Sequence, residues 1–137
     1  MLTEDELPDD IFYLKDEIYP FTGTCLVYFS NSEQIKEEMC FKNGLLDGRR
    51  TSYYRNGKVK RQGEYHKGDL NGKWTGFDNK GNKIYEINYK NDTLVGCFVS
   101  WYSTGIIEVK GNYYNNQKVG KWIHYDESGM ILSSIDL

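Results

Sequence analysis

Residues 71–77 read Asn-Gly-Lys-Trp-Thr-Gly-Phe, and the pattern of this stretch returns along most of the chain. Its first glycine is one of five anchor glycines, which follow one another at intervals of 25, 24, 24 and 24 residues. The anchors are Gly23, Gly48, Gly72, Gly96 and Gly120. An internal period of this length is typical of a repeat protein, in which each unit packs only against its neighbours.

Four further columns recur with the same period. A second glycine follows the last four anchors by nine residues, at Gly57, Gly81, Gly105 and Gly129. An aromatic residue follows every anchor by five residues, at Tyr28, Tyr53, Phe77, Trp101 and Tyr125. The position two residues after the anchor holds Cys25, Arg50, Trp74, Phe98 and Trp122. The position two residues before it holds Phe21, Leu46, Leu70, Leu94 and Lys118.

Each unit has the sequence of a β-hairpin. Strand-like residues 48–54 and 58–65 flank Asn56-Gly57, a strong hairpin signal because both residues tolerate positive φ. Short polar turns also join successive units, at 42–44, 66–68, 90–92 and 115–117. A composition with twelve tyrosines, fourteen glycines and no alanine favours strands and turns over helices. The sequence therefore predicts an all-β fold of tandem antiparallel β-hairpins that form one elongated, twisted sheet.

The two aromatic columns leave one question open. The positions two and five residues after an anchor are separated by an odd number of residues, so a regular strand places them on opposite faces. Either a β-bulge lies between them, or both faces of the sheet carry aromatic side chains. The sequence alone supports both alternatives.

The period also predicts the organisation of the chain. Residues 1–22 are expected to form an acidic N-terminal segment and a divergent half-repeat that caps the array. Residues 23–137 form the repeat domain, with units at 23–47, 48–71, 72–95, 96–119 and 120–137. The last unit is short, and we expect residues 131–137 to end it as a single strand.

These columns resemble the MORN repeat in its variant form. Residues 47–58 and 71–77 match the pattern G-x-W-x-x-Y-x-x-x-G of that family, and the resemblance covers about residues 10–137. The opening residues 20–24, Pro-Phe-Thr-Gly-Thr, are similar to those of the small bacterial YwqK-type proteins, an antitoxin- or immunity-like group. The resemblance implies a binding scaffold, because a repeat positions a surface and the surface residues decide what it binds.

Residues that could carry chemistry are scattered. The two histidines, His66 and His124, fall in different units, and the three cysteines, Cys25, Cys40 and Cys97, lack the close spacing of a metal site. The glycines follow turn positions and form no phosphate-binding motif. We therefore predict that the chain is not an enzyme and has no catalytic residues, no metal site and no cofactor.

Charge is distributed unevenly. Residues 1–22 contain seven acidic residues and one lysine, whereas residues 48–71 contain seven lysines and arginines and two acidic residues. Either both segments only increase solubility, or they are contact surfaces for a basic protein partner or an anionic lipid. The candidate partner-binding residues are Glu4, Asp5, Glu6, Asp9, Asp10, Arg49, Arg50, Arg55, Lys60 and Arg61.

The sequence thus predicts a protein-binding repeat module, with the resemblance pointing to the antitoxin or immunity partner of a toxin or effector. The alternative is a peripheral scaffold associated with phospholipid or the cell envelope. A pI near 5.4 does not favour nucleic acid as the partner. No apolar run approaches the roughly 20 residues of a membrane span, and the N-terminus lacks the features of a secretory signal, which predicts a cytoplasmic protein. The oligomeric state stays open.

Overall fold

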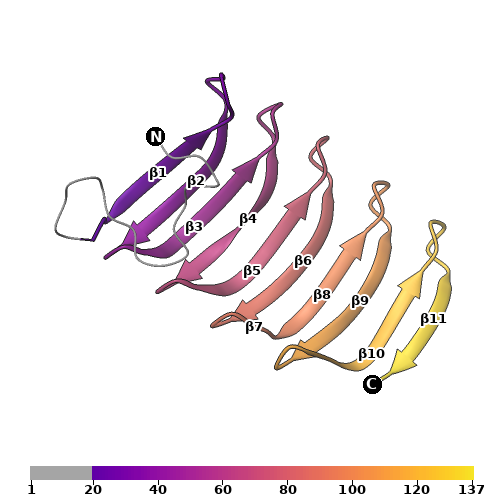
Figure 1. Ribbon diagram of the computed structural model, residues 1–137. Helices are drawn as coiled ribbons and strands as arrows, with labels where there is room; N and C mark the ends of the chain where they lie inside the picture. The colour runs from indigo at the N-terminus through magenta and orange to yellow at the C-terminus, as the bar shows by residue number, and fades with distance from the viewer. Residues whose placement is uncertain (1–19) are drawn as a thin grey trace.

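The computed structural model describes residues 20–137, which form a single open antiparallel sheet (Figure 1). The strands are β1 (Gly23–Tyr28), β2 (Ile35–Lys42), β3 (Leu45–Tyr53), β4 (Val59–His66), β5 (Asp69–Phe77), β6 (Lys83–Lys90), β7 (Thr93–Leu94), β8 (Gly96–Trp101), β9 (Ile107–Tyr114), β10 (Gln117–Tyr125) and β11 (Ile131–Asp136). They lie side by side in chain order, except that the short β7 pairs only with β6 and β8 takes the next place. The predicted all-β array of hairpins is confirmed, and the chain ends in one final strand.

Two kinds of turn alternate along the array. Successive units are joined by two-residue turns in which both residues have positive φ, at 43–44, 67–68, 91–92 and 115–116. This backbone is that of a type I′ turn, whose twist matches that of the adjacent strands. The turn inside a unit is longer, with the amide of Gly57 donating to the carbonyl of Tyr54 and the amide of Tyr54 to that of Lys58.

The turn inside the unit uses its asparagine and its glycine differently. Gly57 has a φ of 86°, whereas Asn56 is not among the residues with positive φ. The Oδ1 atom of Asn56 accepts a hydrogen bond of 2.9 Å from the amide of Lys58. Asn56 therefore stabilises the loop through its side chain and needs no left-handed backbone.

The two-residue turns also tie each hairpin to the one before it. In four turns the amide of the second residue donates to the carbonyl of an apolar residue one repeat earlier. These bonds run from Gly44 to Phe21, from Gly68 to Leu46, from Asp92 to Leu70 and from Asn116 to Leu94, at 2.7 to 3.1 Å. In these four units the residue two positions before the anchor therefore accepts, through its carbonyl, a hydrogen bond from the two-residue turn of the next unit.

Three anchor glycines, Gly48, Gly72 and Gly120, lie inside strands, and the other two, Gly23 and Gly96, begin them. Gly72 has a φ of 86°, and all five anchors have positive φ. Around Gly72 the register of β5 on β4 passes from Asn71 opposite Glu64 to Thr75 opposite Gln62, so three residues of β5 face Gly63 alone. This is a β-bulge, and a Cβ at Gly72 would touch nothing within 4 Å. Position 72 therefore favours glycine because of its positive φ and not because a side chain would collide with a neighbour.

Both faces of the sheet carry aromatic side chains, which settles the question that the sequence left open. The pairing of β5 with β6 is regular from Gly72 to Gly76, so Trp74 and Phe77 point to opposite sides. The bulge at Gly72 lies before Trp74, and the register shift between Gly76 and Phe77 adds a residue to β6 and none to β5. The preceding unit agrees, since Arg50 bonds to Glu37 of β2 whereas Tyr53 bonds to the adjacent Glu38. We call the side that carries Trp74 and Trp122 the Trp face.

Few side chains are fully buried, since residues 20–137 form one layer. The buried apolar residues of this part are Val27, Met39, Phe41, Trp74 and Trp122. Val27, Met39 and Phe41 form a cluster at the β1–β3 end, against which Phe21 and Leu46 pack. The two tryptophans are buried further along the sheet, where they need a local contact of their own.

Each tryptophan lies on a glycine that is in none of the periodic columns, and a third such glycine lies under a tyrosine. Gly63 lies under the indole of Trp74, Gly111 under that of Trp122, and Gly76 under the ring of Tyr85, because a Cβ at each of them would overlap the ring. The Nε1 atom of Trp74 donates to the carbonyl of Glu64 at 3.2 Å, and that of Trp122 donates to the carbonyl of Asn112 at 3.1 Å. The missing side chain lets each indole cover its neighbouring strand.

The hairpins are also linked at the opposite edge, where a 48-residue period appears. The hydroxyl of Tyr54 donates to the carbonyl of Phe77 at 2.6 Å, and the hydroxyl of Tyr102 donates to the carbonyl of Tyr125 at 2.7 Å. The two tyrosines are two units apart, as are Trp74 and Trp122. The array therefore repeats most closely in pairs of units.

Substitution of Gly63 by alanine is expected to lower the free energy of unfolding by about 1–3 kcal/mol, because the methyl group displaces the indole of Trp74. The measurement is urea unfolding of Gly63→Ala, Trp74→Phe and the double variant. The smaller phenylalanine ring should reduce the cost of the alanine. An equal cost in both backgrounds would show that overlap with the indole is not its cause.

Substitution of Tyr54 by phenylalanine is expected to lower the free energy of unfolding by about 0.5–1.5 kcal/mol, since the carbonyl of Phe77 loses its donor. The matched control is Tyr114→Phe, because Tyr114 is 72% exposed and its hydroxyl makes no hydrogen bond within residues 20–137. Urea unfolding of both variants checks the difference. Equal stabilities would contradict a role for the Tyr54 hydroxyl in joining hairpins.

Candidate binding groove

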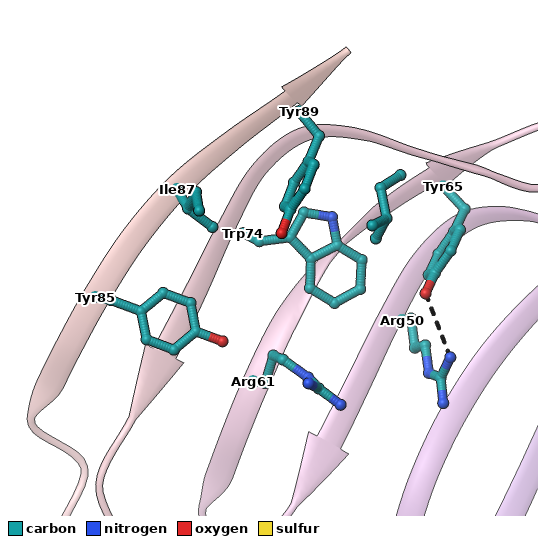
Figure 2. Close-up of a pocket in the computed structure, with 8 residues that line it drawn as sticks. Arg50, Arg61, Tyr65, Trp74, Tyr85, Ile87 and Tyr89 are labelled. Carbon is teal, nitrogen blue, oxygen red and sulfur yellow. Dashed lines mark hydrogen bonds between the residues drawn. The ribbon is translucent and has the colours of Figure 1, made fainter. Parts of the chain in front are cut away.

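A groove of about 360 Å³ lies on the Trp face over β3–β6 (Figure 2). Two arginines, three tyrosines and a tryptophan supply most of its lining: Arg50, Arg61, Tyr65, Trp74, Tyr85 and Tyr89. Leu70 and Ile87 complete it. Its volume is within the range of pockets that hold a small ligand or a few side chains of a partner.

Strand alternation brings these residues together. Tyr85, Ile87 and Tyr89 are alternate residues of β6 and therefore share one face. Ile87 is opposite Trp74 in the register of β5 and β6. Arg61 and Tyr65 belong to the same face of β4, since they are four residues apart on one strand. Residues from four strands thus reach a common opening.

The floor of the groove is rigid and apolar. Trp74 is 5% exposed, and its indole covers Gly63. The ring of Tyr65 meets the indole edge to face, with centroids 5.3 Å apart and an angle of 87° between the planes. This arrangement suits the quadrupoles of the two rings and holds the exposed part of the indole in one orientation.

Arg50 is held at one end of the groove by a buried carboxylate. Its Nε atom is 3.2 Å from Oε2 of Glu37, which is 2% exposed and also accepts hydrogen bonds from the hydroxyl of Ser52. Its Nη1 atom donates to the hydroxyl of Tyr65 at 3.4 Å. Burial disfavours the charged guanidinium, but Glu37 and Tyr65 more than offset this and raise the pKa of Arg50. The charge of Arg50 is therefore balanced within the protein.

Arg61 differs, because its charge has no such partner. It is exposed, and it makes no hydrogen bond or ion pair with any residue between 20 and 137. Figure 2 shows its side chain between Tyr85 and Arg50, at the opening of the groove. Burial and the neighbouring Tyr85 raise the pKa of Tyr89, so its hydroxyl is a neutral hydrogen-bond donor at neutral pH.

The structure divides the basic residues that the sequence singled out. Arg50 and Arg61 lie in the groove, whereas Arg49 is exposed on the opposite face. Arg55 lies in the loop after β3, with its guanidinium 4.7 Å from the centroid of Phe29. Lys60 is exposed, with its ammonium 5.8 Å from the centroid of Tyr54. The acidic candidates Glu4, Asp5, Glu6, Asp9 and Asp10 lie outside the described residues.

The sequence did not single out the aromatic lining of the groove. Trp74 belongs to the column two residues after the anchor, and Tyr65 and Tyr89 each lie 17 residues after an anchor, but Tyr85 belongs to no aromatic column. The sequence does contain one indication of the packing, since Gly63 and Gly111 each precede a tryptophan by 11 residues. This spacing predicts contact between glycine and indole only when the strand register is known, because the register places the glycine under the indole.

A second copy of this scaffold lies 48 residues further along the chain. There the indole of Trp122 covers Gly111, and Tyr113 meets it with centroids 5.1 Å apart. The positions that correspond to Arg50, Arg61, Tyr85 and Tyr89 hold Phe98, Val109, Ser133 and Leu137. The packing of indole on glycine is thus common to both copies, whereas the arginines and two of the tyrosines occur only in the groove over β3–β6.

Removal of the Glu37 carboxylate by Glu37→Ala is expected to lower the free energy of unfolding by about 3 kcal/mol, because it leaves Arg50 half-buried without a counter-charge. The matched control is Glu86→Ala, since Glu86 pairs with the exposed Lys83 and Lys73 and should contribute about 0.5 kcal/mol or less. Urea unfolding measures both. Similar losses in the two variants would contradict the special role of the buried pair.

Comparison with known proteins adds the family of the repeat. The model of the MORN repeat variant matches residues 46–67, 70–91 and 118–136. No curated protein and no solved structure matches the chain. Within residues 20–137, no three metal-ligating side chains are placed to share an ion, and no helix is long and apolar enough to cross a membrane. These three segments are thus similar to the MORN repeat variant, a type of repeat that generally serves as a non-catalytic binding module.

Proposed function

We propose that this chain is a protein-binding module that contacts its partner through the Trp-face groove over β3–β6. The observation that carries this proposal is the convergence of Trp74, three tyrosines and the unpaired Arg61 at one opening. Tryptophan, tyrosine and arginine are the residues that contribute most to the affinity of protein interfaces. The match of the chain to a type of repeat that generally binds other molecules supports the same function.

The rigidity of the groove favours binding. The indole of Trp74 is fixed by Gly63 beneath it, by its hydrogen bond to Glu64 and by the edge of Tyr65. Arg50 is fixed by Glu37. Side chains that are already ordered lose little conformational entropy when a partner binds, so more of the contact energy contributes to affinity.

The partner class that we propose is a toxin or effector, which this chain neutralises as an antitoxin or immunity protein does. The support is the resemblance of residues 20–24 and of the repeats to the antitoxin-like group. A direct test is co-expression with the product of a neighbouring gene that arrests growth. Rescue of growth by the wild-type chain is expected, and failure of the chain to rescue or to bind that product would contradict this partner class.

The alternative, a scaffold on phospholipid, has less support from the structure. A lipid surface meets one side of a protein, and it attracts basic residues that point to that side together. Here Arg49 lies on the face opposite Arg61, so the basic residues do not all point to one side, although Arg55 and Lys60 line one pocket together with Arg61. Flotation with phosphatidylserine vesicles is expected to leave the chain unbound, and binding that is lost on reversal of these charges would favour the scaffold instead.

Substitution of Arg61 by alanine is expected to reduce capture of the partner at least tenfold, the effect of losing about 1.4 kcal/mol at an interface. The matched control is Arg49→Ala, which removes the same charge from the opposite face of the sheet. The measurement is quantitative mass spectrometry of proteins that tagged chains retain from native lysate. Equal retention by all three chains, or equal loss in both variants, would contradict binding through the groove.

A further inference from the structure

We propose that the groove recognises a protein segment in which a carboxylate stands next to an apolar or aromatic side chain. Arg61 binds the carboxylate, and the apolar side chain rests on Trp74. This inference rests on the proposed function, and it names the chemistry of the bound segment. Four features of the groove support it.

The first feature is the charge of the groove. None of its lining residues is acidic, and of its two guanidinium groups that of Arg50 is neutralised by Glu37 at 3.2 Å. Of these two charges, that of Arg61 has no counter-charge among residues 20–137. Within the groove this one guanidinium lies beside neutral hydrogen-bond donors, which suits a singly charged carboxylate, and Arg55 and Lys60 line an adjoining pocket that Arg61 also borders.

The second feature is the apolar floor beside that charge. Arg61 pairs with Gly76 on the neighbouring strand, so no side chain of β5 stands at that position. Trp74 lies two residues away on the same face, with Leu70 and Ile87 on either side of the groove. Figure 2 shows the guanidinium of Arg61 below the indole of Trp74. An acidic residue and an apolar neighbour in one segment therefore reach both groups together.

The third feature is a set of free donors at the rim. The hydroxyls of Tyr85 and Tyr89 make no hydrogen bond to any described residue, and Figure 2 shows both on the Trp face. Each donates to a second carboxylate oxygen or to a backbone carbonyl of an extended segment. The indole, the phenols and the guanidinium thus provide one apolar contact and several directed polar contacts.

The fourth feature is the copy of the scaffold over β8–β11. It has the same indole on glycine, but Val109 replaces Arg61 and Ser133 replaces Tyr85. The indole and the glycine under it occur in both copies because they pack the sheet. The arginine and tyrosine positions differ between the copies, so these residues determine which segment binds. Acidic segments are expected to bind over β3–β6 and not over β8–β11.

The test is selection of heptapeptides from a random phage library against three full-length chains. These are the wild type, Arg61→Glu, and Arg49→Glu as the control with the same charge change on the opposite face. Circular dichroism confirms that each variant is folded. The selected peptides are then titrated against each chain by fluorescence polarisation.

Peptides selected by the wild type and by Arg49→Glu are expected to be enriched in aspartate or glutamate beside leucine, phenylalanine, tyrosine or tryptophan. Their affinity for Arg61→Glu should fall at least tenfold, and Arg61→Glu should select lysine or arginine instead. Peptides that need Arg61 but carry no acidic residue would overturn the inference and leave the groove as the binding site. Peptides that bind Arg61→Glu as well as the wild type would overturn both proposals.

Discussion

The indole of Trp74 covers Gly63 on the neighbouring strand, and much of the sheet around it depends on this contact. Residues 20–137 form one layer without an opposing sheet, and Trp74 is buried by lying on its own sheet. The glycine makes room for the indole, and the carbonyl of Glu64 fixes its nitrogen. Trp122 lies on Gly111 in the same way, so this packing recurs in the scaffold and is not peculiar to one unit.

Two further features of the backbone support this contact, namely the anchor glycines with their bulges and the two-residue turns. The anchor glycines adopt positive φ inside the strands or at their first residue, and the bulge at Gly72 places three residues of β5 opposite Gly63. The two-residue turns then bond each hairpin to the carbonyl of an apolar residue one repeat earlier. Bulges set where the tryptophan lies, and turns keep successive hairpins in register. The exposed side chains are left to determine binding.

Much of this fold follows from the periodic columns. The glycines and polar turns predicted the hairpins and their order, because tight turns need residues that tolerate positive φ. The candidate site was harder to predict. Arg49 and Arg50 were grouped by charge, yet adjacent residues of a strand point to opposite faces, and the structure separates them. The meeting of Arg61, Tyr85 and Trp74 depends on the register of three strands, which no single stretch of sequence reveals.

Comparison of the two copies separates the residues that pack the sheet from those that recognise a partner. The most direct measurement transfers the recognition residues to the second copy with Val109→Arg, Lys118→Leu, Ser133→Tyr and Leu137→Tyr. Isothermal titration calorimetry with a peptide that binds the wild-type groove then gives the number of sites. A rise from one site to two is expected in the folded variant. A folded variant that still binds one peptide would contradict recognition by these residues.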